Sequence, residues 1–261
     1  MRIIPAINCQ DFDCVKEKLL KAAEFSDWAQ IDIADGKFTQ YENGGSNFLS
    51  SHGADKKNAI DDSGGNVPKS AASKKLGEDS RHFSTGFTGY TTWNNPQELK
   101  EFLIKNPEFK IKNIEVHLMV EHPTEAMIPW MAFANRIILH VETLSPSDFI
   151  MSPEDKRFEI GLAINPDTDI QKVIPRLSKI KFVQILAVLP GKAGQKLDER
   201  VLEKITFLKK NYPDVILEVD GGINLETAKI CKEAGADIIA SASYIFDSGD
   251  PEKAYRALEL I

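Results

Sequence analysis

Two aspartates and one histidine are the residues of this sequence whose types and spacing indicate acid–base chemistry. Asp220 ends an alternating run, and two glycines follow it before a helical pattern begins. Asp32 and His117 lie in two other alternating runs. A strand that leads through glycines into a helix start offers backbone N–H groups to an anion, and carboxylates at such a strand end could transfer protons. The simpler interpretation of the stretch around Asp220 is a tight strand–helix turn with a capping aspartate.

Alternation also predicts which side chains share a face, because successive residues of a strand point to opposite sides. The shared faces are expected to hold Gln30, Asp32 and Ala34 in one run, Glu115, His117 and Met119 in the next, and Ile216, Glu218 and Asp220 in the third. Buried charges are costly unless they are paired, hydrogen-bonded or bound to a metal. A lone His117 would most often be structural, but two carboxylates at matching heights beside it indicate a functional site.

Strand-like and helix-like segments alternate along the chain. We expect eight strands, at Arg2–Ile7, Trp28–Ile33, Ile114–Val120, Arg136–Val141, Ile160–Ile164, Phe182–Val188, Val215–Asp220 and Ala236–Ala240. Helical patterns follow at Phe12–Phe25, Pro96–Ile104, Thr124–Phe133, Ile170–Leu177, Leu197–Asn211, around Ala228–Cys231, and at Pro251–Leu260. This alternation implies a parallel sheet, and eight units imply a closed (β/α)8 TIM barrel of the α/β class.

One segment interrupts the alternation. We expect a single barrel domain over residues 1–261, with an insertion at about 42–91 in the loop after the second strand. Residues 42–91 hold 8 of the 16 glycines, together with 8 serines. Long loops of this kind are usually functional or disordered, and this one would lie on the catalytic face of a barrel. A lid and a surface insertion without a role are both open.

Composition limits the classes of partner. A formal net charge of −7 argues against a nucleic-acid or membrane-surface partner. The three cysteines are scattered and form no Cys-x-x-Cys pair, so we expect neither a disulfide framework nor a zinc ribbon. The first residues contain too short an apolar run for a signal peptide, and no stretch reads as a transmembrane span. We therefore expect a cytoplasmic protein.

Six segments resemble motifs of the ribulose-phosphate 3-epimerase family, in the correct order and spacing. They are Ile31–Phe38, Val116–Met119, His140–Glu142, Gly161–Pro166, Pro190–Lys196 and Glu218–Asn224. The resemblance covers the chain apart from the insertion, and it implies a TIM barrel of the ribulose-phosphate-binding type.

The resemblance implies a mechanism and a set of site residues. Asp32 and Asp220 match the two catalytic aspartates, one removing a proton beside the ketone and the other returning it through an enediolate. A divalent metal cation (Zn, Mn, Fe or Mg) would be held by Asp32, His117, Asp220 and the residue at position 30. The substrate and its phosphate would contact His117, Met119, Gly191, Gly194, Gly221, Gly222, Ala242 and Ser243.

The sequence also departs from the family pattern. Gln30 stands where the family has its first histidine ligand, and an amide oxygen binds zinc less well than imidazole does. We expect the metal to bind weakly and exchangeably, or to be absent. Ala6 stands in place of a serine beside the substrate, and Ala34 in place of a methionine.

Three functions stay open. The first is an epimerase of a ketose phosphate, with ribulose 5-phosphate and xylulose 5-phosphate as the leading pair. The second is a related barrel enzyme acting on a different sugar phosphate, and the third is a non-catalytic sugar-phosphate-binding barrel. In each case the expected partner is a small sugar phosphate, without nucleic acid or membrane, and a homo-oligomer is possible.

Overall fold

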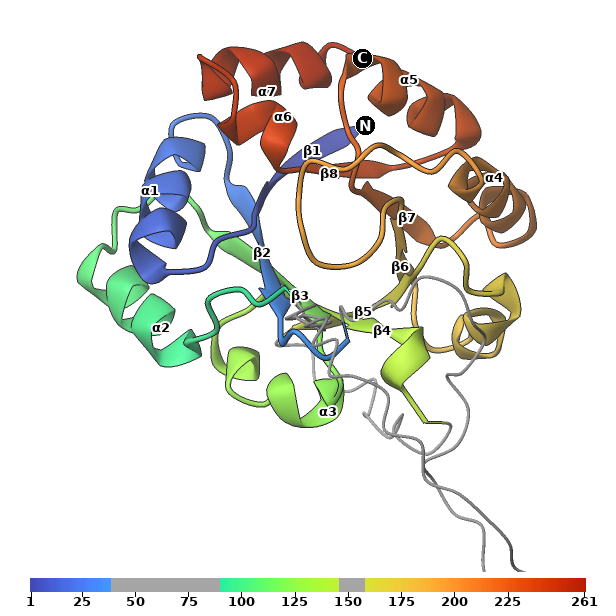
Figure 1. Cartoon of the computed structure of the whole chain (residues 1–261), viewed down its shortest axis with the longest axis horizontal. Helices are drawn as coiled ribbons and strands as arrows, with labels where there is room; N and C mark the ends of the chain where they lie inside the picture. The colour runs from blue at the N-terminus through green and yellow to red at the C-terminus, as the bar shows by residue number, and fades with distance from the viewer. Residues whose placement is uncertain (39–89, 146–157) are drawn as a thin grey trace, which may run out of the picture. The chain divides into compact units, whose positions relative to one another are not determined.

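Eight parallel strands form a closed barrel in the computed structural model of this chain (Figure 1). The structure describes residues 1–38, 90–145 and 158–261. The predicted insertion at 42–91 therefore lies outside the described residues, apart from its last two positions. The strands follow one another around the barrel in chain order, and β1 pairs with β8 to close it. The predicted (β/α)8 TIM barrel is confirmed.

The strand boundaries agree with the alternating runs to within one or two residues. They are β1 Arg2–Ile7, β2 Trp28–Ala34, β3 Asn113–Met119, β4 Arg136–His140, β5 Glu159–Ile164, β6 Phe182–Leu186, β7 Ile216–Asp220 and β8 Ile238–Ser241. Each is short and apolar on the face that meets the helices, as expected for a parallel sheet covered by helices.

Helices surround the barrel in Figure 1. They are α1 Phe12–Ala22, α2 Pro96–Lys105, α3 Pro123–Ala126, α4 Val201–Asn211, α5 Leu225–Ala234, α6 Ser243–Phe246 and α7 Pro251–Glu259. The main core lies between these helices and the strands, whereas a small cluster fills the inside of the barrel with Ile4, Ile138, Ala163, Phe182 and Ile238.

Three helical predictions are wrong in extent or type. The predicted helix Thr124–Phe133 is α3 followed by a separate 3₁₀ turn, η1 (Trp130–Ala132), and Ile170–Leu177 forms only two 3₁₀ turns, η3 (Ile170–Lys172) and η4 (Ile174–Arg176). Pro129 and Pro175 interrupt these segments, because proline has no N–H for an i→i−4 bond. The helix expected from Leu197 begins only at Val201, and the Asp198 N–H before it bonds to the Ala187 carbonyl.

A disulfide joins Cys9 and Cys14, contrary to the expectation from the cysteine spacing. Cys9 follows β1 and Cys14 lies in the first turn of α1, so the turn between them brings their Cα atoms to 5.8 Å, which suits a disulfide. Cys231 is a buried free thiol.

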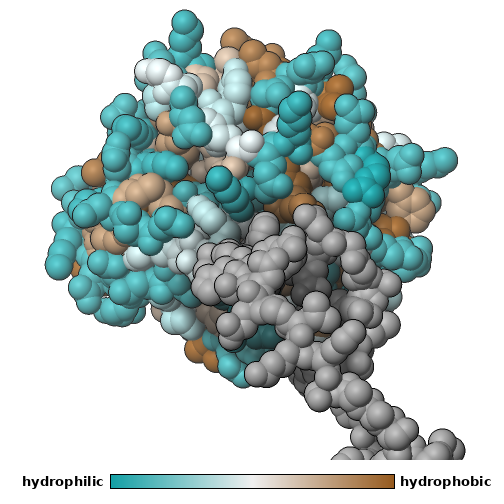
Figure 2. Space-filling view, viewed as in Figure 1, coloured by the Kyte–Doolittle hydropathy of each residue, from teal (hydrophilic) through white to brown (hydrophobic). Residues whose placement is uncertain are grey.

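The surface in Figure 2 is largely hydrophilic over the described residues, with apolar side chains scattered among the polar ones. Among the helices that the structure describes, none is both long and apolar enough to cross a membrane.

Candidate functional site

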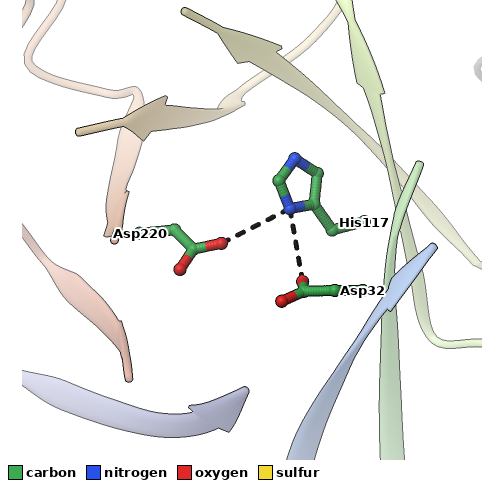
Figure 3. A group of neighbouring side chains, drawn as sticks. All are labelled: Asp32, His117 and Asp220. Carbon is green, nitrogen blue, oxygen red and sulfur yellow. Dashed lines mark ion pairs between the residues drawn. The ribbon is translucent and has the colours of Figure 1, made fainter. Parts of the chain in front are cut away.

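Asp32, His117 and Asp220 meet inside the barrel, at the carboxyl ends of β2, β3 and β7 (Figure 3). The His117 Nδ1 atom lies 3.4 Å from Asp32 Oδ1 and 3.3 Å from Asp220 Oδ2. His117 is fully buried, and both aspartates are nearly so. The strand register places Asp32 directly opposite His117, whereas Asp220 reaches the same point from the other side of the barrel.

Gln30, two residues before Asp32 in β2, donates hydrogen bonds to both carboxylates. Its Nε2 donates to Asp32 Oδ1 at 2.7 Å and to Asp220 Oδ2 at 2.8 Å. Its Oε1 accepts from Gln184 Nε2 at 3.0 Å. Carboxylates accept hydrogen bonds and do not donate them, so this pattern turns the amide nitrogen of Gln30, not its oxygen, toward the site.

This orientation differs from the one that the expected ligand role of Gln30 requires. In this structure Gln30 faces the carboxylates with a donor, and a metal ligand must supply a lone pair. Among the described His, Cys, Asp and Glu side chains, Asp32, His117 and Asp220 could hold a metal together, because their ligand atoms all lie within 4.8 Å of one another.

The three remaining groups fit a metal ion in two respects. Ligands about 2.1 Å from a tetrahedral ion are roughly 3.4 Å apart, and the two carboxylate oxygens lie at 3.4 and 3.3 Å from His117 Nδ1. The Nδ1 atom is also buried without a well-directed hydrogen bond among the described residues. A set of three protein ligands leaves coordination positions for a substrate, as catalytic sites do.

The surroundings of Asp220 and His117 raise the pKa of both groups. Burial raises the pKa of Asp220, and the charge of Asp32 raises it further. Burial alone would lower the pKa of His117, but its contacts with Asp220 and Asp32 outweigh that effect and raise the pKa to about 9. Without a metal, the imidazole is therefore a cation between two carboxyl groups at neutral pH.

A pocket opens above Asp32 and Asp220. Seven of the eight residues expected at the substrate line it: Met119, Gly191, Gly194, Gly221, Gly222, Ala242 and Ser243. The eighth, His117, has no exposed surface and lies behind the carboxylates. The strand–glycine–helix stretch thus does form one wall of the pocket.

The glycine pair after β7 has the conformation that a close approach requires. Gly222 has a φ of +68°, and a Cβ atom there would lie 2.2 Å from the Leu197 backbone nitrogen. The start of α5 is less open than its sequence indicates, because the Asn224 side chain accepts from the N–H groups of Glu226 and Thr227. An anion would therefore meet the N–H groups of the glycine turn rather than those two.

Comparison with known proteins places the chain in a family. It matches the ribulose-phosphate 3 epimerase family over residues 103–246, more than half of its length. The chain belongs to the ribulose-phosphate 3-epimerase family. His117 and Asp220 fall within the matched residues, whereas Asp32 and Gln30 precede them.

Individual relatives agree with this assignment. Ribulose-phosphate 3-epimerase of Schizosaccharomyces pombe is 33% identical over 147 residues, which are 55% of this chain and 64% of that protein. The Bacillus subtilis protein of the same name is 34% identical over 149 residues, covering 54% of this chain and 68% of the relative. The match to the yeast relative thus spans less than two thirds of that protein.

Solved structures share the fold of this epimerase-family chain. A 3-hexulose-6-phosphate synthase has a TM-score of 0.58 and 16% identity, covering 100% of this chain and 99% of its own. Orotidine 5'-phosphate decarboxylase from Pyrococcus horikoshii OT3 has a TM-score of 0.53 and 12% identity, with coverage of 98% and 96%. At these identities the likeness concerns the barrel alone.

Two polar residues of the site were not singled out from the sequence. Asn8 donates to the Gly191 carbonyl at 2.9 Å and lies 3.4 Å from Asp32 Oδ2, and its own Oδ1 accepts from the Tyr90 hydroxyl at 2.7 Å. Gln184 donates to Gln30. The sequence pattern could have identified both residues. Asn8 directly follows β1, at the end of the barrel that holds the site, and alternation in β6 places Gln184 on the inner face.

Proposed function

We propose that this chain is an epimerase that inverts C3 of a ketose phosphate, with ribulose 5-phosphate and xylulose 5-phosphate as the leading pair. The observation that carries the proposal is the meeting of two buried carboxyl groups, from β2 and β7, at the base of one pocket. Membership of the ribulose-phosphate 3-epimerase family supports the reaction class.

Two carboxyl groups suit this chemistry because an epimerisation needs a base on one side of a carbon and an acid on the other. In one direction, the Asp32 carboxylate takes the proton from C3, and the C–H electrons form an enediolate with the neighbouring carbonyl. Asp220 then delivers its proton to the opposite face of C3. The raised pKa of Asp220 favours its protonated form and hence the acid role; in the reverse direction the roles exchange.

The phosphate of the substrate would lie between the loops after β6, β7 and β8. Gly222 contributes a backbone N–H to which no acceptor is bonded among the described residues. Ser243 lies on the neighbouring wall of the same pocket. Lys192, an exposed residue in the loop after β6, also lines the pocket, and its positive charge complements an anion.

Asp32, His117 and Asp220 would hold the divalent cation. When bound, such an ion supplies positive charge that polarises the ketone and stabilises the enediolate. Gln30 holds the two carboxylates by donating to one oxygen of each. Asn8 approaches the other oxygen of Asp32, so the base is held from two directions.

Exchange of the C3 proton tests the proposal directly. Purified protein is incubated with ribulose 5-phosphate in D₂O, separately with Zn²⁺, Mn²⁺, Fe²⁺ or Mg²⁺ and with a chelator. We expect deuterium at C3 and formation of xylulose 5-phosphate by NMR. Exchange that appears only with another ketose phosphate would instead support the related enzyme acting on a different sugar phosphate. Binding of sugar phosphates without any exchange would support the non-catalytic barrel.

A further inference from the structure

His117 makes a second contact, on the side of its ring that faces away from the carboxylates. Figure 3 shows the second ring nitrogen of His117 pointing away from Asp32 and Asp220. This nitrogen, Nε2, lies 2.8 Å from Nε2 of His140, at the end of β4. Both rings are fully buried.

The two imidazoles meet edge to edge. Their ring centres are 5.0 Å apart and their planes differ by 23°. That separation is close to the N···N distance plus the two ring radii, so both nitrogens lie near the line that joins the ring centres. The geometry is that of a hydrogen bond in the ring planes. One Nε2 must therefore carry a hydrogen and the other must offer its lone pair.

Glu142 decides which nitrogen carries the hydrogen. His140 Nδ1 lies 3.1 Å from Glu142 Oε2, and Glu142 Oε1 accepts from the Asn165 backbone N–H at 2.8 Å. Burial raises the pKa of Glu142, but its bonds with His140, Thr168 and Asn165 outweigh this effect and lower it. An ionised carboxylate only accepts, so the hydrogen of this contact is on His140 Nδ1.

The position of the hydrogen on His140 determines which ring donates the hydrogen bond between the two imidazoles. A hydrogen bond between two nitrogens holds a single hydrogen, so only one of the two rings can carry a second hydrogen and a positive charge. His117 Nδ1 faces two carboxylates, at 3.4 and 3.3 Å, whereas His140 Nδ1 faces one, so the charge is on His117 and His140 holds a single hydrogen. That hydrogen is on Nδ1, which leaves a lone pair on Nε2. His117 must then donate from its own Nε2.

We infer that His140 and Glu142 are positioning residues that fix a hydrogen on His117 Nε2 and so direct its Nδ1 to the two carboxylates. The inference rests on the proposed function, because it assigns both residues to the same site. With Nε2 committed, Nδ1 is the only His117 nitrogen that can bind an ion or exchange a proton with Asp32 and Asp220. Outer partners that fix a ligand histidine in this way commonly change metal affinity when they are mutated.

NMR of the whole chain labelled with ¹⁵N-histidine tests the arrangement without a substrate. In metal-free protein at neutral pH, we expect a ¹⁵N–¹⁵N coupling across the hydrogen bond between the two Nε2 atoms. We also expect a protonated Nδ1 and an unprotonated Nε2 on His140. A hydrogen on His140 Nε2, or no coupling between the two rings, would overturn the inference.

We call the hydrogen bonds from His117 to His140 and from His140 to Glu142 the relay. The variant Glu142→Gln should reverse the direction of both bonds. The Asn165 N–H keeps the amide oxygen in place of Oε1, so the new NH₂ group faces His140 Nδ1 and donates to it. The Thr168 hydroxyl can donate or accept, so it does not oppose this orientation. His140 would then carry its hydrogen on Nε2 and donate to His117, which would give up its Nε2 hydrogen and keep the one on Nδ1.

Two measurements follow this reversal. The protonated His140 nitrogen should change from Nδ1 to Nε2 in the NMR spectrum, and the affinity for Zn²⁺ in calorimetric titration should fall by about 10- to 100-fold. The matched control is Glu159→Gln. Glu159 lies at the start of β5, and its carboxylate bonds to Arg136. This change should leave the His140 tautomer and the zinc affinity unchanged.

The outcomes separate this inference from the proposed function. A chain that shows the wild-type couplings and their reversal, but no exchange of the C3 proton, would retain the relay and lose the epimerase assignment. An active epimerase with the same His140 tautomer and the same zinc affinity in Glu142→Gln would retain the assignment and lose the relay.

Discussion

The proposed reaction depends most directly on the carboxyl groups of Asp32 and Asp220. Changing either to Asn preserves shape but removes proton transfer, so turnover should fall by about 10²–10⁴-fold. Steady-state kinetics on the substrate identified by C3 exchange measures the loss. Asp13→Asn, an exposed change on α1, serves as the control. Full turnover in both active-site variants would refute the assignment.

The residue at position 30 is expected to control the affinity of the site for a metal ion. In the wild type its amide donates to both carboxylates, and imidazole at this position would add a lone pair to the three existing groups. We therefore expect weak, exchangeable zinc in the wild type and higher affinity in Gln30→His. Calorimetric titration compares the two proteins, with the exposed change Gln97→His as a control for added histidine. Tight, stoichiometric zinc in the wild type that the substitution leaves unchanged would contradict this prediction.

At the scale of elements, the turn between β7 and α5 combines a required backbone conformation with a proposed phosphate site. Gly222→Ala would put a Cβ atom against the Leu197 backbone at a φ of +68°. We expect a loss of stability of about 1–3 kcal/mol and weaker protection by sulfate against thermal unfolding. Gly249→Ala is the matched control, because a Cβ atom there would meet nothing within 4 Å. Equal stability and equal sulfate protection in the two variants would count against both roles of the turn.

The same elements predict where an anion binds. A crystal soaked in sulfate should show the ion within hydrogen-bond distance of the backbone N–H groups of Gly222 and Ser243. These groups come from the loops after β7 and β8, which line one pocket. Sulfate bound only elsewhere on the surface would argue against a phosphate site between these loops.

At the scale of the whole molecule, a polar column runs through the barrel beneath the site. Arg136 donates to Glu115 at 2.5 Å, and its guanidinium lies 3.7 Å from the centre of the Phe182 ring. Glu115 Oε1 and Glu218 Oε2 are both buried without a hydrogen-bond partner among the described residues, and Glu218 Oε1 accepts from Gln184 at 2.9 Å. Because Gln184 also donates to Gln30, Glu218 is connected to the two aspartates by hydrogen bonds.

This column predicts a pH dependence of stability. Burial raises the pKa of Glu218 well above its ordinary value, and the charge of Glu115 raises it further. The folded state therefore holds a proton that the unfolded chain releases near pH 4.5. Stability must fall as the pH rises from there toward the folded-state pKa, by about 1.4 kcal/mol for each unit of the shift.

Glu218→Gln should remove this dependence. Its amide oxygen can still accept from Gln184, and an amide, unlike a carboxyl group, does not titrate in this range. Urea unfolding with a chelator, between pH 4.5 and 8, should give a flatter stability profile than that of the wild type. The exposed change Glu24→Gln is the control. Parallel profiles for wild type and Glu218→Gln would show that the carboxyl pair does not hold this proton.

The sequence by itself determined the barrel and the meeting of Asp32, His117 and Asp220. Both follow from short-range rules: side chains alternate along a strand, and parallel strands place their carboxyl ends on the same side. The helical patterns are less reliable at Pro129 and Pro175, because proline has no N–H to continue a helix, and short 3₁₀ turns form there instead.

Only the tertiary structure decided how the polar groups are paired. Whether Gln30 presents a donor or a lone pair depends on Gln184, which is 154 positions away in the chain. The contact of His117 with His140 depends on the register of β3 against β4, and the Cys9–Cys14 disulfide on the path of a turn. Hydrogen-bond direction is fixed by distances of a few ångströms between residues that sequence spacing does not relate. The pattern could therefore place the candidate residues in one site, but their donors, acceptors and ligand atoms required the folded barrel.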